Sequence, residues 1–173
     1  MIPIQPGGVK QARACQTGEL VRFDGGGGSL LAVALGLIEL DRYQNYLILQ
    51  SSVHDIPAFS ALPLDANHHC FSYGEDWVLE MIADGETFPG NGEGADTLGE
   101  IRIFDTSASM IVNVLDTQMR GRRLLLNLAN YQPLAGRNER YQGARIQSWK
   151  IWASEDERTR IGGRAILEFP MPA

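Results

Sequence analysis

The feature that most constrains the fold is an apolar run that follows four glycines, residues 25–28, and Ser29. Large and small side chains alternate along this run: the large set is Leu31, Val33, Leu35 and Leu37, and the small set is Ala32, Ala34 and Gly36. A period of two is typical of a β-strand, whose successive side chains point to opposite faces. A helix would be apolar on every side and would contain an interior glycine. We therefore favour a long buried strand within residues 29–44, with a helix as the alternative.

The glycines themselves favour a tight bend or bulge that leads into this strand. A phosphate-binding loop needs glycines at fixed offsets and a lysine followed by serine or threonine, and neither is present here. A flexible linker needs an independent domain on each side, yet only 24 residues precede Gly25.

Further segments either alternate in the same way or are rich in β-branched residues: 46–53, 77–83, 100–104, 110–116, 124–130, 145–153 and 164–169. In total, about eight or nine strands separated by Gly, Pro, Asn and Asp predict an all-β fold, an antiparallel β-sandwich or a barrel-like domain. The clearest hairpin joins residues 110–116 to 124–130 through a turn that contains Gly121. Residues 107–120 also fit one short capped helix, which is the alternative there.

A chain of 173 residues predicts a single β-rich domain over residues 1–173. Prolines near both ends indicate extended segments, an N-terminal arm over residues 1–18 and a C-terminal tail over 170–173. Residues 83–100 are polar and glycine-rich, and we expect them to form a surface loop.

The charge is divided unequally along the chain. Residues 1–100 carry 14 acidic and 4 basic side chains, whereas residues 101–173 carry 7 acidic and 11 basic ones. The net charge of −6 disfavours specific nucleic-acid binding, but opposite patches could pair between copies of the chain. Arginine, which is enriched at protein interfaces, accounts for 13 of the 15 basic residues. The expected cationic contacts are Arg120, Arg122, Arg123, Arg137 and Arg140, and the anionic ones are Glu86, Glu93, Asp96 and Glu100.

Several sequence features bear on the compartment of the protein. Cys15 and Cys70 are 55 positions apart, and this spacing indicates neither a disulfide framework nor a standard metal motif. The N-terminus lacks the charged start and apolar core of a secretory signal, and the longest apolar run is too short for a membrane helix. We expect a protein that does not enter membranes and is cytoplasmic when synthesised.

Two groups of residues are candidate metal ligands. His54, His68, His69 and Cys70 include every histidine of the chain, and in a strand His68 and Cys70 would share a face. Their spacing matches no standard zinc pattern, so our expectation is that they hold no metal. The carboxylates of residues 83–100 are oxygen donors of the kind that calcium takes, but their order differs from the known helix-loop-helix signature. We expect no cofactor, with calcium in this loop as the alternative.

Aromatic and cationic side chains alternate in residues 137–152, where Tyr141, Trp149 and Trp152 could stack against a sugar or a base. Trp149 and Trp152 are three positions apart, so in a strand they point to opposite faces. At most one of them can therefore reach an outer surface.

The sequence contains no convincing catalytic constellation, and we expect a non-catalytic structural protein that assembles with copies of itself or with neighbouring structural proteins. The setting that fits best is the head or tail of a bacteriophage-like virion. The alternative is a β-sandwich module that binds a ligand such as a carbohydrate. A second alternative is a small hydrolase or metalloenzyme built on the histidines and Cys70.

Overall fold

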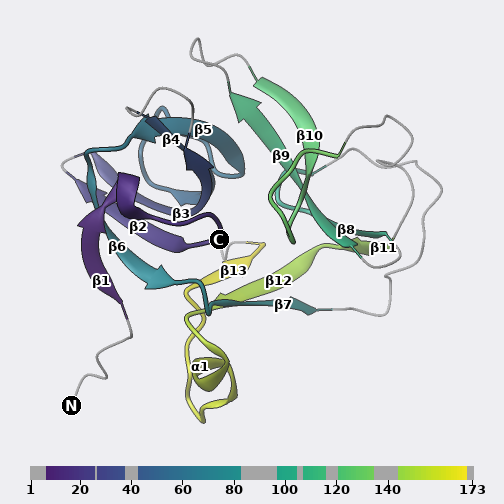
Figure 1. Cartoon of the computed structure of the whole chain (residues 1–173). Helices are drawn as coiled ribbons and strands as arrows, with labels where there is room; N and C mark the ends of the chain where they lie inside the picture. The colour runs from purple at the N-terminus through teal and green to yellow at the C-terminus, as the bar shows by residue number, and fades with distance from the viewer. Residues whose placement is uncertain are drawn as a thin grey trace.

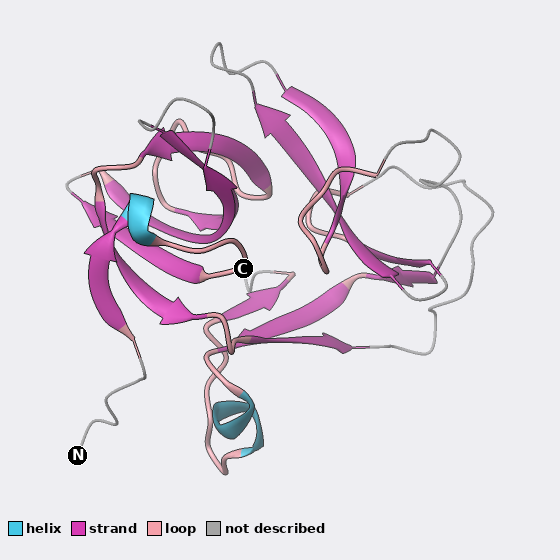
Figure 2. Ribbon diagram, in the orientation of Figure 1, coloured by secondary structure: helices cyan, strands magenta, loops and turns pink. Residues whose placement is uncertain are grey.

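The computed structural model describes residues 7–25, 27–37, 43–82, 97–104, 107–115, 121–134 and 144–170. These residues form two sheets of mainly antiparallel strands, so the predicted all-β, sandwich-like fold is confirmed (Figure 1). The described strands do not close into a barrel (Figure 2). None of the described helices is long and apolar enough to cross a membrane.

The larger sheet has ten strands in the order β1-β6-β2-β3-β4-β5-β9-β8-β11, with β10 paired to β9. Its strands are β1 (Gly8–Gln11), β2 (Leu20–Gly25), β3 (Gly28–Leu37), β4 (Tyr43–Ser51), β5 (Ser60–Asp65), β6 (His69–Gly74), β8 (Ile101–Phe104), β9 (Ser107–Leu115), β10 (Gly121–Asn127) and β11 (Ala144–Ile146). The smaller sheet has the order β13-β12-β7, formed by β7 (Val78–Ile82), β12 (Ser148–Trp152) and β13 (Leu167–Phe169). The described secondary structure also includes two short helices, η1 (Ala12–Ala14) and α1 (Glu155–Thr159).

The glycine block ends the β2–β3 hairpin, in which Gly25 is paired with Gly28. Gly28 has a φ of 130°, and a Cβ there would lie 2.7 Å from Ser52 Oγ, so this position requires glycine. β3 then pairs with β4 in antiparallel register. The predicted bend and the strand interpretation are therefore confirmed, and the helix alternative is wrong for the residues of 29–44 that the structure describes.

The predicted hairpin between β9 and β10 is also confirmed, with pairs that run from Gly121↔Leu115 to Asn127↔Ser109. Residues 107–115 form a strand and not a helix, because both faces of β9 are covered. Met110 and Val112 enter the core between the sheets, while Leu115 enters a second core. The turn at residues 116–120 lies outside the described residues.

Two apolar cores lie on opposite faces of the β2–β4 region. The first lies between the two sheets and contains Leu31, Val33 and Trp149. The second contains Ala32, Ala34 and Tyr46 on the other face of the same strands. The alternation of large and small side chains in the sequence therefore corresponds to two different cores, with the small side chains on the face where Ala12 of η1 packs.

The N-terminal residues that the structure describes do not form a free arm. β1 pairs with β6, and Ala12 is completely buried in the second core. The predicted arm over residues 1–18 is thus incorrect for residues 8–18, while residues 1–6 lie outside the described residues. At the other end, β13 pairs with β12 and Pro170 follows it, and residues 171–173 of the predicted tail are not among the described ones.

An aromatic junction of Phe59, Trp149 and Phe169 joins the two sheets. Trp149 is fully buried, stacks on Phe169 with ring centroids 5.2 Å apart, and meets Phe59 edge-on at 6.0 Å. Its indole N–H donates to the Gly99 carbonyl over 2.8 Å. Gly99 has a φ of 84°, and a Cβ there would lie 2.8 Å from the Phe59 ring. The junction therefore depends on a glycine at this position.

We predict that Gly99→Ala lowers the free energy of unfolding by about 2 to 3 kcal/mol, because alanine adds both backbone strain and a clash with Phe59. The matched control is Gly25→Ala, since a Cβ at Gly25 meets nothing within 4 Å. This control should change stability by less than about 0.5 kcal/mol. Urea unfolding followed by tryptophan fluorescence measures both; equal stability of the two variants would contradict the role of Gly99.

Candidate functional site

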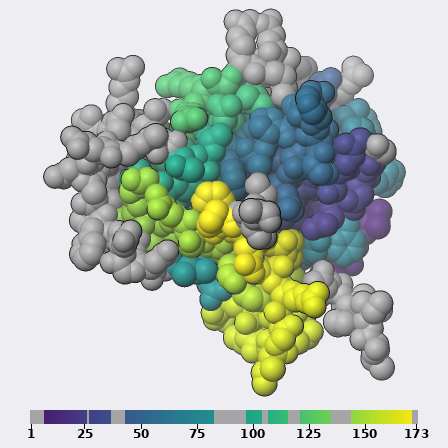
Figure 3. Space-filling model, turned by 180° about the vertical axis from the view of Figure 1, so that it is seen from behind, coloured from purple at the N-terminus to yellow at the C-terminus, as the bar shows by residue number. Residues whose placement is uncertain are grey.

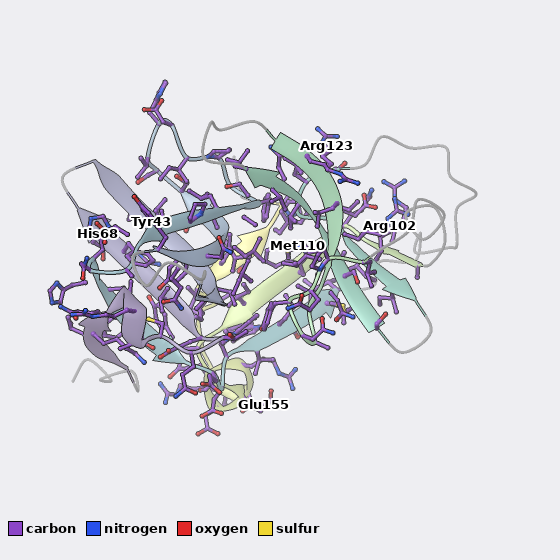
Figure 4. All side chains as sticks on the ribbon, turned by 45° about the horizontal axis from the view of Figure 1, so that its top comes forward. Tyr43, His68, Arg102, Met110, Arg123 and Glu155 are labelled. Carbon is purple, nitrogen blue, oxygen red and sulfur yellow. The ribbon has the colours of Figure 1, made fainter. Side chains whose placement is uncertain are left out.

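Of the predicted cationic contacts, the structure describes Arg122 and Arg123. Both lie near the start of β10, an outer strand of the large sheet, and both are exposed. Figure 4 labels Arg123. Arg120, Arg137 and Arg140 lie outside the described residues. The structure thus places two of the five arginines at a sheet edge, where a neighbouring molecule could reach them.

Glu100 does not belong to an anionic surface, which corrects its predicted role. Its side chain is completely buried and forms a bidentate pair with Arg145, with Nε–Oε1 and Nη2–Oε2 distances of 2.9 and 2.7 Å. Arg102 Nε lies 2.8 Å from the same carboxylate. Because Arg102 and Arg145 are directly opposite each other on β8 and β11, Glu100 offsets two cations at one point. The other anionic candidates, Glu86, Glu93 and Asp96, lie outside the described residues, as does most of the proposed calcium loop.

Trp149 cannot serve as a stacking platform, because it is fully buried in the aromatic junction. Trp152 lies on the opposite face of β12, as predicted, and its indole N–H donates to Glu80 on β7 over 2.9 Å. Tyr141 lies outside the described residues. Of the three predicted stacking residues, Trp152 alone is therefore both described and partly exposed.

The histidines do not gather into a site with Cys70. The side chain of His54 is 98% exposed and contacts the neighbouring Asp55. His68 and His69 border a surface hollow of about 340 Å³ together with Phe23 and Asp24, whereas Cys70 is buried. Within the described part of the chain, no three His, Cys, Asp or Glu residues are close enough to hold a metal ion.

The described residues contain a second hollow, of about 460 Å³, between the start of β1, the end of β6 and the start of α1. Lys10, Ser72, Asp76 and Asp156 lie along it. Lys10 is already paired with the buried Glu19, which also accepts hydrogen bonds from Ser72 and from the Gln16 backbone N–H. These groups therefore hold the N-terminal segment to the sheet.

A lobe over residues 153–166 projects from the molecule between β12 and β13, and Figure 3 shows it in yellow-green and yellow. Ser154 caps α1 by accepting a hydrogen bond from the Glu157 N–H. Arg160 pairs with Glu157 at 2.7 Å, and the Gly163 N–H donates to the Arg160 carbonyl. The lobe thus has internal hydrogen bonds and ion pairs of its own, although it contributes little to either core.

Ile161 lies in this lobe and is fully exposed, with a relative accessibility of 102%. Arg160 and Arg164, both exposed, flank it in the sequence. Further large apolar side chains are exposed on edge strands: Val9 on β1, and Met81 and Ile82 on β7. A single exposed apolar side chain is ordinary in a soluble protein. Arginine is, however, enriched at protein interfaces, so the exposed Ile161 beside two exposed arginines makes this lobe a candidate contact surface.

Sequence reasoning missed one pair of residues altogether. Cys15 and Cys70 are both buried, and their sulfurs lie 3.5 Å apart. Their separation of 55 positions gave no signal, because the contact depends on β1 pairing directly with β6, and four strands, β2 to β5, separate these two in the sequence. Two isolated cysteines form no sequence motif from which their contact could be predicted.

Comparison of the chain with protein-family models, with curated proteins and with solved structures found no match.

We predict that Glu100→Gln destabilises the fold by about 3 kcal/mol, because it leaves two buried or partly buried arginines without their carboxylate. Glu168→Gln provides the control, since Glu168 is half-exposed and pairs with Lys150 at 3.1 Å. An exposed pair contributes at most about 1 kcal/mol. Chemical denaturation at neutral pH tests this difference, and similar losses in the two variants would refute a special role for Glu100.

The Glu19–Lys10 pair predicts a pH dependence of stability. Burial alone raises the pKa of Glu19, but the hydrogen bonds from Lys10, Ser72 and the Gln16 N–H outweigh it and hold that pKa below its usual range. A lowered pKa means that Glu19 stabilises the fold above about pH 4.3 and loses this contribution as the pH falls. We expect Glu19→Gln to be less stable by roughly 1 to 3 kcal/mol at pH 7. The difference should shrink when unfolding is measured near pH 3, and a constant difference would contradict the assignment.

Proposed function

We propose that this chain is a non-catalytic assembly protein that works by contacting other subunits, either copies of itself or neighbouring structural proteins. The observation that carries the proposal is Ile161, an aliphatic side chain held fully exposed on an ordered lobe outside both cores. Such a side chain gains free energy from burial when a partner covers it.

The charges around Ile161 support an acidic partner surface. Arg158 and Arg160 are already paired inside the lobe with Glu155 and Glu157, so the cation that the lobe offers beside Ile161 is the exposed Arg164. The first 100 residues of the chain carry a strong negative excess. A contact between the lobe of one subunit and the acidic part of the next would be heterologous, and repeated contacts of this kind form rings or filaments. Each contact could be small because symmetry repeats it.

The internal ion pairs of the described residues agree with this proposal. Glu19 and Glu100, the buried carboxylates, are both neutralised by cations of their own chain. A general acid or base would instead need a carboxylate that faces a substrate. We extend the proposal to a bacteriophage-like virion as the setting, on the basis of the arginine-rich composition and the all-β architecture.

The test is sedimentation velocity of the purified chain over a range of concentrations and at low salt. We expect the wild-type chain to associate and Ile161→Glu to weaken this association by about tenfold or more, since the charge cannot be buried in an apolar contact. His54→Glu is the matched control, because it adds a negative charge at a side chain that is 98% exposed in the β4–β5 connection. That variant should associate like the wild type.

Two outcomes would count against the proposal. Equal association of Ile161→Glu and wild type would remove the lobe from the contact. A chain that stays monomeric at high concentration and low salt, and that has no companion when its mass is measured in its native source, would overturn the assembly role itself.

A further inference from the structure

The two cysteines of the chain face each other beneath the N-terminal segment. Cys15 follows η1, and Cys70 lies in β6 opposite Lys10 of β1. Their accessibilities are 7% and 3%, and both are free thiols whose sulfurs lie 3.5 Å apart, within hydrogen-bond distance. The chain has two cysteines in all, so an intramolecular disulfide can form only between these two.

Backbone contacts on both sides hold the thiols in this position. The Ala12 and Arg13 N–H groups donate to the carbonyls of His68 and Ala66 over 2.8 and 2.9 Å. The Gln44 side chain donates to the Cys15 carbonyl over 3.0 Å, which fixes the chain at the cysteine itself. A disulfide has an S–S length of about 2.05 Å, so the sulfurs need to approach by roughly 1.5 Å, within reach of side-chain rotation and a small backbone shift.

We propose that Cys15 and Cys70 form a site of reversible oxidation, at which a hydroperoxide converts the facing thiols into a disulfide that fastens residues 8–18 to β6. This inference rests on the geometry of the two thiols and is independent of the proposed assembly function.

The reaction balances with hydrogen peroxide as the oxidant. The Cys15 thiolate attacks one peroxide oxygen, the O–O bond breaks, and the hydroxide that leaves takes up a proton to become water. The Cys15 sulfenic acid formed in this way is then attacked by the Cys70 sulfur. The S–S bond forms as the S–O bond breaks, and the Cys70 proton leaves with the second water. The two sulfurs together lose two electrons, and the peroxide gains them.

The surroundings support Cys15 as the attacking sulfur. The hydrogen bond from the Cys70 thiol lowers the pKa of Cys15 most, and this effect outweighs burial, which raises it. The Lys10 ammonium also lowers the pKa of Cys15, while the Glu19 carboxylate opposes it. The hydrogen bond to Cys15 and burial both raise the pKa of Cys70, so that thiol keeps its proton until the second step. Tyr46 is the remaining titratable neighbour, and burial raises its pKa.

A disulfide here would change how the N-terminal segment behaves. In the reduced protein, β1 and η1 are held by hydrogen bonds, the Lys10–Glu19 pair and burial, and they can separate from β6 without breaking a covalent bond. In the oxidised protein, the segment stays attached even when those contacts open. Restricting the unfolded chain across 55 positions also raises the thermal stability of the protein.

The experiment treats the full-length, reduced, folded chain with a small excess of hydrogen peroxide. We expect an intact mass lower by two hydrogen atoms, a Cys15–Cys70 cross-linked peptide in a non-reducing digest, and a Tm higher by roughly 5–10 °C. A reductant should reverse all three changes. Hydrogen exchange of residues 8–18 should slow in the oxidised form.

Two variants test the order of the steps. Cys70→Ser should trap the Cys15 sulfenic acid, detected with a diketone reagent, and Cys15→Ser should leave Cys70 as a thiol. The proposal is overturned if both wild-type thiols remain open to alkylation in denaturant after peroxide, or if the cross-links form only between chains. It is likewise overturned if oxidation stops at a sulfinic acid on one cysteine or lowers the Tm. The wild-type measurements decide the matter even if a variant fails to fold.

Discussion

The packing of Trp149 between Phe59 and Phe169 is the contact on which the relation between the two sheets depends. Phe59 precedes β5, Trp149 lies in β12 and Phe169 ends β13, so three rings from two sheets meet at one point. Gly99 lies directly against this group and leads into Glu100, whose carboxylate holds β8 and β11 together. Apolar packing between the sheets and ion pairing at the edge of the large sheet are therefore adjacent, and a change at Gly99 reaches both. Aromatic pairs add to the free energy of area burial through their preferred edge-to-face and stacked geometries.

The N-terminal segment has a comparable role on the opposite face of the large sheet. The small side chains of β3 leave room there, and η1 approaches closely enough for Ala12 and Cys15 to join the second core. Burying Glu19 in this region is costly by itself, but Lys10 and Ser72 supply the charge and the hydrogen bond that offset the cost. The same segment thus completes a core, buries a carboxylate and brings two thiols together. The segment is therefore already attached to β6 in the reduced protein, and the disulfide that we propose would reinforce these contacts.

The sequence predicted those features that local pattern controls. Alternation identified β3 and β4, and a three-residue spacing correctly separated the buried Trp149 from Trp152. Prediction from the sequence failed where pairing between distant segments decides which side chains are buried. We expect Glu100 at the surface from the sequence because it ends a polar, glycine-rich stretch, yet Arg145 on the neighbouring strand β11, together with Arg102 two positions further along the chain, pairs with it in the interior. The meeting of Cys15 with Cys70 likewise follows from the strand order, in which β6 lies between β1 and β2. Such a crossover leaves no periodic trace in the sequence.

The division between buried and exposed side chains also bears on the assembly proposal. Among the described residues, the buried carboxylates Glu19 and Glu100 are paired with cations of the same chain, and the rings of Phe59, Trp149 and Phe169 pack at the junction between the sheets. The lobe differs, because α1 has no buried residue and Ile161 has no covering side chain, although a cap and ion pairs keep the lobe ordered. Holding an exposed apolar side chain in place adds no stability to the monomer, because such a side chain is stabilising only when it is buried. A partner that covers Ile161 would supply that missing burial, and an ordered lobe would lose less conformational entropy on binding than a flexible one.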